Sequence, residues 1–162
     1  MRLTLVSAAI CAGAAALEGV AAGRDVRARF AELQLPRFSP PLAMWIAIGL
    51  GYYVVCFVVL LRLLSLDSAS TQRAVALGLL IAAMLINAAW GWLFFRLKNM
   101  RASYLTYLPY GIIILALATL LLRIDPGSAL VLLPYLVYLI YAAWWGRALW
   151  RLNGAPGVGR AA

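Results

Sequence analysis

The sequence predicts an all-α integral membrane protein, a single-domain bundle of five membrane-spanning helices. Three observations predict it: 66% of the 162 residues are hydrophobic and 12% are charged, the mean hydropathy is +0.95, and the apolar residues fall into five long runs. Soluble domains are about 45–50% apolar and about 25% charged. A helix needs about 20 apolar residues to cross the hydrocarbon core, so a bilayer accommodates runs that a water-soluble fold of this size could not hide.

Polar or turn-forming segments separate the five runs and set their boundaries. These segments are residues 23–25, 65–73, 96–101 and 125–127, and they contain most of the charged, glycine and serine residues between the runs. The spans are expected at about residues 3–22, 42–64, 74–97, 104–122 and 129–149, within one domain of residues 1–153, and residues 154–162 are expected to form a short cytoplasmic tail.

The first run has two interpretations, because Arg2 followed by an apolar, alanine-rich stretch also resembles a cleaved signal peptide. The run is long, however, and Glu18 lies inside it. We therefore expect a retained membrane helix. Glu18 lies near the cytoplasmic end of this run, where we expect it to reach the interface or to pair with Arg24 or Arg27 rather than to contact a ligand.

The basic residues divide unevenly between the two sides of the predicted bundle. Four of the 14 lie on the side of the N-terminus and ten on the opposite side. Since cytoplasmic loops carry the excess of lysine and arginine, the N-terminus is expected outside and the C-terminus in the cytoplasm. The ten residues of the cytoplasmic side are Arg24, Arg27, Arg29, Arg37, Arg96, Lys98, Arg101, Arg147, Arg151 and Arg160.

The composition excludes several function classes. The chain has no histidine, which removes the commonest metal ligand and general base. It has no paired-carboxylate site, no cluster of metal-ligand residues, no Ser/His/Asp set and no glycine-rich phosphate loop. No catalytic residue and no metal ligand is therefore predicted. The net charge of +9 is assigned to topology and lipid headgroups rather than to nucleic acid.

One intramembrane amide stands out in the third run. Asn87 lies mid-span, where its side chain must find a hydrogen-bond partner, and Trp90 shares its helix face three residues later. The amide either fixes the packing of two helices or contacts a ligand.

Aromatic residues also gather in the fifth run. Trp150, with Trp144 or Trp145, fits an interfacial belt. Tyr138 and Tyr141 fall deeper and share a helix face with Trp145. Together with the third run, this stripe either lines a cavity for a flat apolar ligand or forms a tightly packed bundle.

Three blocks of sequence resemble a known family, in the right order and spacing. Residues 87–95 (NAAWGWLFF) resemble the Asn-x-x-Trp-x-x-x-Phe-Phe motif of the TspO/MBR family, the tryptophan-rich sensory proteins related to the mitochondrial translocator. Residues 134–136 (PYL) and 150–153 (WRLN) are similar to its fifth-helix motif, and residues 35–41 (LPRFSPP) to its Lys-Pro-x-Trp-x-Pro-Pro block. The resemblance covers essentially the whole chain.

The resemblance implies a five-helix bundle, usually a homodimer, in the bacterial inner membrane. It implies a pocket toward the side of the long first loop that binds porphyrins, sterols or benzodiazepine-site ligands. By position, the expected ligand-binding residues are Asn87, Trp90, Tyr138 and Ala142, and with them Tyr53, Trp45, Phe94 and Tyr141.

The chain departs from the family pattern at several positions. Leu35 replaces the lysine of the proline block, Phe38 replaces its tryptophan, and Gly49 and Tyr138 stand where pocket tryptophans are usual. The two missing tryptophans lower the expectation of porphyrin photochemistry. The cholesterol-recognition pattern is also absent at its position in the mammalian members, where Arg147 and Ala148 stand, so a porphyrin or haem-type ligand is a better expectation than a sterol, and no cofactor is expected to be required.

The expected function is binding of a flat apolar ligand, such as a tetrapyrrole, for transport or stress signalling. One alternative is a light- and oxygen-dependent porphyrin-degrading enzyme. The other is a structural or partner-binding membrane protein without a ligand.

Overall fold

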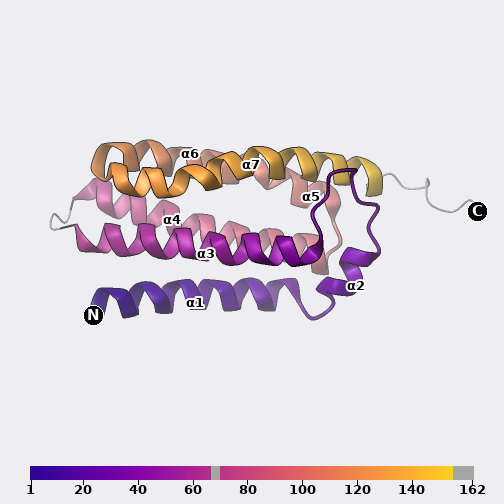
Figure 1. The fold of residues 1–162 in the computed structure, drawn as a ribbon, viewed down its shortest axis with the longest axis horizontal. Helices are drawn as coiled ribbons and strands as arrows, with labels where there is room; N and C mark the ends of the chain where they lie inside the picture. The colour runs from indigo at the N-terminus through magenta and orange to yellow at the C-terminus, as the bar shows by residue number, and fades with distance from the viewer. Residues whose placement is uncertain (67–69, 155–162) are drawn as a thin grey trace, which may run out of the picture.

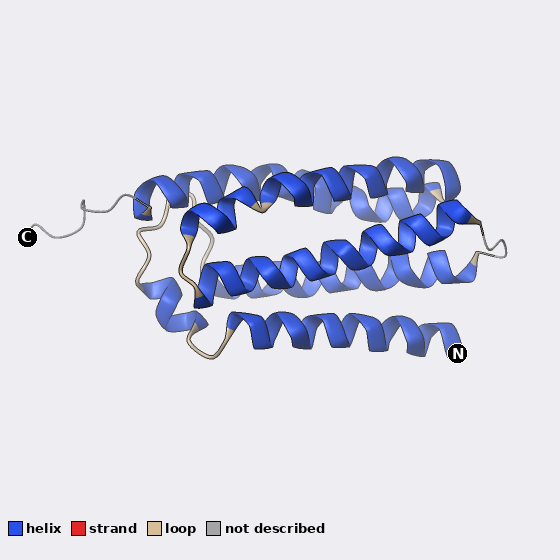
Figure 2. Cartoon of the chain, turned by 180° about the vertical axis from the view of Figure 1, so that it is seen from behind, coloured by secondary structure: helices blue, strands red, loops and turns tan. Residues whose placement is uncertain are grey.

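The computed structural model describes residues 1–66 and 70–154, and over these residues it contains helices and no strand (Figure 2). Five helices in this part of the chain are long and apolar enough to cross a membrane, as the hydropathy predicted. They are Arg2–Ala22 (α1), Leu42–Ser65 (α3), Thr71–Arg96 (α4 and η1), Met100–Ile124 (α5 and α6) and Pro126–Asn153 (α7). Residues 155–162, most of the expected tail, lie outside the described residues.

The helix ends are extended relative to the hydropathy runs because capping residues lie outside the apolar segments. Ser70 caps α4 (Thr71–Gly91) by accepting a hydrogen bond from the backbone N–H of Arg73 at 3.2 Å. Asn99 caps the short helix α5 (Met100–Leu105) in the same way, through the N–H of Ala102 at 2.9 Å. Hydropathy does not detect such polar caps.

The last helix begins inside a segment that the sequence analysis assigned to a turn. Pro126 occupies the first position of α7 (Pro126–Asn153), where the fixed φ of proline suits a helix and its missing N–H costs nothing. The turn is reduced to Asp125, which ends α6 (Tyr107–Ile124).

The five spans pack as a bundle in which α1 lies against α3 and α4, while α6 lies between α4 and α7. Figure 1 shows the start of α1 and the end of α7 at opposite ends of this bundle. The long connection between α1 and α3, which contains the short helix α2 (Val26–Ala31), lies at the same end as the end of α7 (Figure 1).

The long connection is fastened to α7 by side-chain hydrogen bonds. Asn153 accepts from the N–H of Gln34 at 2.9 Å and donates to its carbonyl at 3.0 Å. The indole N–H of Trp145 donates to the hydroxyl of Ser39 at 2.9 Å. The connection therefore covers this end of the bundle in a fixed position.

At the opposite end, an ion pair joins α3 to the junction of α6 and α7. The guanidinium of Arg62 donates to both oxygens of Asp125, at 2.9 and 2.6 Å. Asp125 also accepts a hydrogen bond from the hydroxyl of the buried Ser128 at 2.5 Å. The bonds from Arg62 are the main cause that lowers the pKa of Asp125 to about 2.

A π-helical turn, Trp92–Arg96 (η1), ends the third span, where the sequence predicted an ordinary helix. Its wider turn is closed by a bond from the N–H of Leu97 to the carbonyl of Trp92 at 3.0 Å. Phe94, within this turn, is buried in a cluster that includes Trp145 and Leu149 of α7.

Candidate ligand-binding cavity

A cavity of about 380 Å³ lies inside the bundle, in the half that is covered by the long connection. Residues of α1, α2, α3, α4, η1, α6 and α7 line it, and most of them are apolar or aromatic. This volume falls in the range of small-molecule sites, which are about 300–1,000 Å³ and are lined mainly by apolar side chains with a few polar groups.

The structure brings seven of the eight expected ligand-binding residues to this cavity. Tyr141 is the exception: its hydroxyl donates to the backbone carbonyl of Phe38 at 2.7 Å, so its polar end is bound to the long connection. Contact of the seven with a ligand stays a prediction. They are Trp45 and Tyr53 of α3, Asn87 and Trp90 of α4, Phe94 of η1, and Tyr138 and Ala142 of α7.

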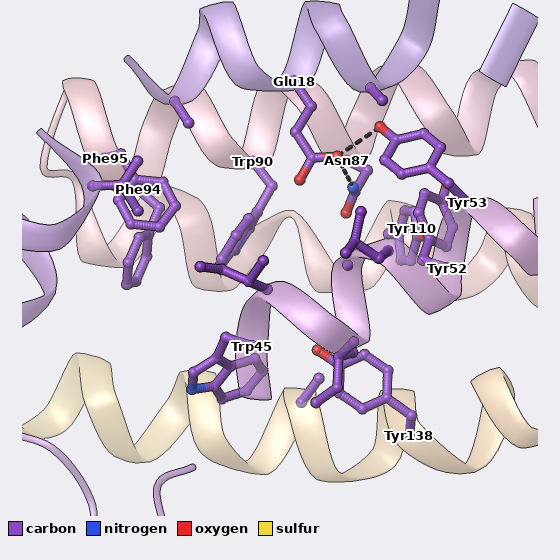
Figure 3. Close-up of a pocket in the computed structure, with 18 of the residues that line it drawn as sticks. Glu18, Trp45, Tyr52, Tyr53, Asn87, Trp90, Phe94, Phe95, Tyr110 and Tyr138 are labelled. Atoms are coloured by element: carbon purple, nitrogen blue, oxygen red, sulfur yellow. Dashed lines mark hydrogen bonds between the residues drawn. The ribbon is translucent and has the colours of Figure 1, made fainter. Parts of the chain in front are cut away.

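Aromatic rings form two walls of the cavity. On one side, the ring of Trp45 lies 4.5 Å from that of Trp145 and 6.3 Å from that of Tyr138, between centroids. On the other, Trp90 stacks on Phe94 with centroids 4.9 Å apart. Figure 3 shows Trp45 and Trp90 on facing sides of the site. Trp90 belongs to the aromatic stripe of the third run, whereas Trp45 comes from the second run.

Glu18 of α1 is the polar centre of the site. Its Oε2 atom accepts a hydrogen bond from the hydroxyl of Tyr53 at 2.6 Å and another from the amide nitrogen of Asn87 at 2.8 Å (Figure 3). Three helices, α1, α3 and α4, are thereby joined at one carboxylate. The amide of Asn87 makes an interhelical hydrogen bond and lines the cavity at once.

The expectation that Glu18 reaches the interface or pairs with Arg24 or Arg27 is wrong. Glu18 lines the cavity and has no salt bridge within residues 1–66 and 70–154. The reason is helical register: Ala15, Glu18, Gly19 and Ala22 line the cavity together, at the spacing i, i+3, i+4, i+7 of one helix face. That spacing of small residues around one carboxylate is the sequence signal that identifies this face.

Of the two candidates for the interfacial belt, Trp144 and Trp145, Trp145 lies inside the bundle, on the helix face that it shares with Tyr138. It is 2% exposed and lines the cavity, while its neighbour Trp144 is 47% exposed. The indole N–H of Trp145 donates to the hydroxyl of Ser39, so this buried polar group does not lack a hydrogen-bond partner. The tyrosines Tyr52, Tyr107, Tyr110 and Tyr135, which the sequence analysis did not select, line the cavity as well.

The hydroxyls of these tyrosines differ in their hydrogen bonding. The hydroxyls of Tyr110 and Tyr135 form a hydrogen bond of 2.6 Å between α6 and α7. The hydroxyl of Tyr52 is buried and has no hydrogen-bond partner within the described part of the chain. The described residues contain no group of histidine, cysteine or acidic side chains that could hold a metal ion.

The chain is thus an integral membrane protein whose five spanning helices line an aromatic cavity. The sequence model of the TspO/MBR family matches residues 6–151, and the chain therefore belongs to this family. It is similar to the translocator protein of Ovis aries, with 29% identity over 139 residues that cover 81% of this chain and 78% of the relative. The translocator protein of Sus scrofa is 30% identical with the same coverage.

Proposed function

We propose that the protein binds a flat apolar ligand, a porphyrin or a related tetrapyrrole, inside the membrane. The observation that carries the proposal is a cavity of about 380 Å³ whose facing walls are aromatic rings. A planar conjugated molecule can stack on such walls, and each ring pair contributes about 0.5–1.5 kcal/mol beyond burial of apolar area. Its role would be transport of the ligand or signalling of its level under stress.

Two features favour a planar ligand over a sterol. The walls carry indole and phenol rings, from Trp45, Trp90 and Tyr138, whose faces match a conjugated ring system. The block of residues 35–41 lacks the lysine and the tryptophan of the family pattern. The cavity beside Asn87 and Trp90 also favours ligand binding over the alternative of a protein without a ligand.

Degradation of the bound porphyrin in light and oxygen is the second candidate. Trp90, retained at the cavity wall, favours it, whereas Gly49 and Tyr138, at positions where the family has tryptophans, reduce the number of indoles next to a ligand. Illumination of the protein–porphyrin complex in air tests it. Bleaching of the porphyrin absorption that requires Trp90 would support degradation, and an unchanged spectrum would contradict it.

We place the protein in the bacterial inner membrane with its N-terminus outside. Within the described residues, the end of the bundle with the long connection carries nine of the ten basic residues counted for the cytoplasmic side. A homodimer is supported by two small residues four positions apart on α4: Ala74 and Gly78 face outward, and an added Cβ at Gly78 would meet no atom within 4 Å.

A titration of protoporphyrin IX into the protein in detergent, read by tryptophan quenching, tests the proposed function. We expect saturable quenching, and a loss of affinity of about five- to tenfold in Trp90→Phe because a stacking surface is reduced. Trp92→Phe is the matched control, since Trp92 is 44% exposed and does not line the cavity. Quenching without saturation, or equal affinity in wild type and Trp90→Phe, would contradict the proposal.

A further inference from the structure

Among the described residues that line the cavity, Glu18 is the one charged side chain. No arginine or lysine of the described chain lines it, although the chain as a whole carries 14 of them. The cavity therefore combines aromatic walls with a single acidic group. This combination restricts which flat ligands the site can accommodate.

The two oxygens of Glu18 are in different situations. Oε2 accepts both hydrogen bonds, from Tyr53 at 2.6 Å and from Asn87 at 2.8 Å. Oε1 has no hydrogen-bond partner within residues 1–66 and 70–154. Figure 3 shows this second oxygen on the side of Trp90, within the cavity. Tyr53 and Asn87 thus orient the carboxylate and leave one acceptor directed at the space for a ligand.

An acidic side chain in a membrane-spanning segment is expensive unless it meets a positive charge or enough donors. Hydrogen bonds in which one partner is charged are about twice as strong as neutral ones. A protonated nitrogen on the ligand would supply both the donor and the counter-charge that Oε1 lacks. The same position lies beside the indole of Trp90, and indole faces attract cations.

We propose that, among flat aromatic ligands, the cavity prefers those that carry a protonated nitrogen, with Glu18 as the group that recognises this nitrogen. The nitrogen donates to Oε1 of Glu18, and the ring system lies between the walls formed by Trp45 and Trp90. The inference rests on the proposed function, because it requires that the cavity holds a flat ligand, and it adds the charge that the ligand carries. An anionic group on a ligand would have to lie away from Glu18.

Three acridines of nearly equal shape test the inference. They are 9-aminoacridine, a cation at neutral pH, acridine, which is neutral, and acridine-9-carboxylate, an anion. Dissociation constants are measured by acridine fluorescence with the full chain in nanodiscs of zwitterionic lipid, after subtraction of empty discs. The wild type is expected to bind the cation about tenfold more tightly than neutral acridine, and the anion most weakly.

The matched variants are Glu18→Gln and Glu32→Gln. Glutamine at position 18 keeps an oxygen for Tyr53 and Asn87 but removes the charge, so 9-aminoacridine and neutral acridine should bind with similar dissociation constants. Glu32, which pairs with Arg29 and Lys98 at 3.2 Å each, lies outside the cavity. Glu32→Gln removes the same charge from the chain and should keep the tenfold preference.

Three results would overturn the inference. If the wild type binds all three acridines equally, or Glu18→Gln keeps the preference for the cation, the inference fails while the proposed function stands. If none of the acridines binds saturably and protoporphyrin IX does not bind either, both fail. The comparison of ligands in the wild type needs no variant, so a Glu18→Gln protein that does not fold leaves the test intact.

Discussion

The carboxylate of Glu18 accepts a hydrogen bond of 2.6 Å from the hydroxyl of Tyr53, which joins α1 to α3 at the cavity. Hydropathy cannot reveal this bond, since it depends on which face of each helix meets the other. It gives α1 a specific attachment to the bundle in addition to the packing of small residues. It also holds in one orientation the carboxylate of Glu18, the only charged side chain of the cavity wall within residues 1–66 and 70–154.

Tyr53→Phe should destabilise the protein by about 1–2 kcal/mol, because a hydrogen bond to a charged or partly buried acceptor is lost without any change of shape. Thermal unfolding in detergent measures it. Tyr104→Phe is the control, since the hydroxyl of Tyr104 makes no hydrogen bond to another described residue. An unfolding midpoint for Tyr53→Phe equal to that of Tyr104→Phe would show that the bond to Glu18 contributes nothing.

Loss of the hydroxyl should affect the free energy of unfolding differently at two buried tyrosines of the cavity, Tyr135 and Tyr52. Tyr135→Phe leaves the hydroxyl of Tyr110 without its 2.6 Å partner and should cost about 1–3 kcal/mol. Tyr52→Phe removes a buried hydroxyl that has no partner in the described chain, so its effect should be neutral or stabilising. Denaturant unfolding of the two variants gives the comparison, and a Tyr52→Phe protein less stable than Tyr135→Phe would refute it.

Acid should weaken the end of the bundle that carries Asp125. Its pKa is lowered from 3.8 to about 2 in the folded protein, chiefly by Arg62. The folded state therefore binds the proton less well than the unfolded state, and the stabilisation, present above about pH 4, is lost as the pH falls toward about 2. After a discount for solvent screening around Arg62, which is 47% exposed, we expect a loss of about 1–2 kcal/mol.

Asp125→Asn tests this pH dependence directly. The variant should be less stable than the wild type at neutral pH and should lose less stability between about pH 5 and about pH 2. Asp25→Asn, at an exposed carboxyl without a salt bridge in the described chain, serves as the control. Parallel stability curves for the wild type and Asp125→Asn would contradict the role assigned to the Arg62 pair.

Gly49→Trp should fill the cavity. An added Cβ at Gly49 meets no atom within 4 Å, and the residue lines the cavity, so a side chain there has space to enter it. We expect at least about a tenfold loss of protoporphyrin IX affinity with unchanged or increased stability, because apolar surface fills a void. Gly13→Leu, on α1 and outside the cavity, should change neither the affinity for protoporphyrin IX nor the stability. Unaltered affinity in Gly49→Trp would place the ligand elsewhere.

Hydropathy alone predicted the five spans because each apolar run in this chain is long enough to cross the hydrocarbon core of a membrane. It could not predict the helix ends at Thr71 and Pro126, where polar caps and proline geometry decide the boundary. Nor could it predict the π-helical turn of residues 92–96, since a π-turn has no simple sequence signal and depends on the surrounding packing.

The sequence identified cavity residues where a polar or large aromatic side chain interrupts an apolar membrane span. Asn87 is a polar residue within an apolar span, where such residues are rare, and Trp90 lies on the same helix face. Both line the cavity. The position of Glu18 depended on rotation of α1, which composition does not fix, and a search for small residues at i, i+3, i+4 and i+7 around it would have found the face. The hydroxyl of Tyr141 instead donates to the carbonyl of Phe38, in a connection whose path the sequence does not specify.

The indole N–H resonances of the six tryptophans in a ¹⁵N-labelled sample report whether the ligand lies between the aromatic walls. A porphyrin's ring current shifts only nearby nuclei, and assignment by single Trp→Phe variants identifies each signal. On addition of protoporphyrin IX, the signals of Trp45, Trp90 and Trp145 should shift, while those of the outward-facing Trp92 and Trp144 should stay in place. Shifts confined to Trp92 and Trp144 would place the ligand on the outer surface of the bundle and rule out binding between the aromatic walls.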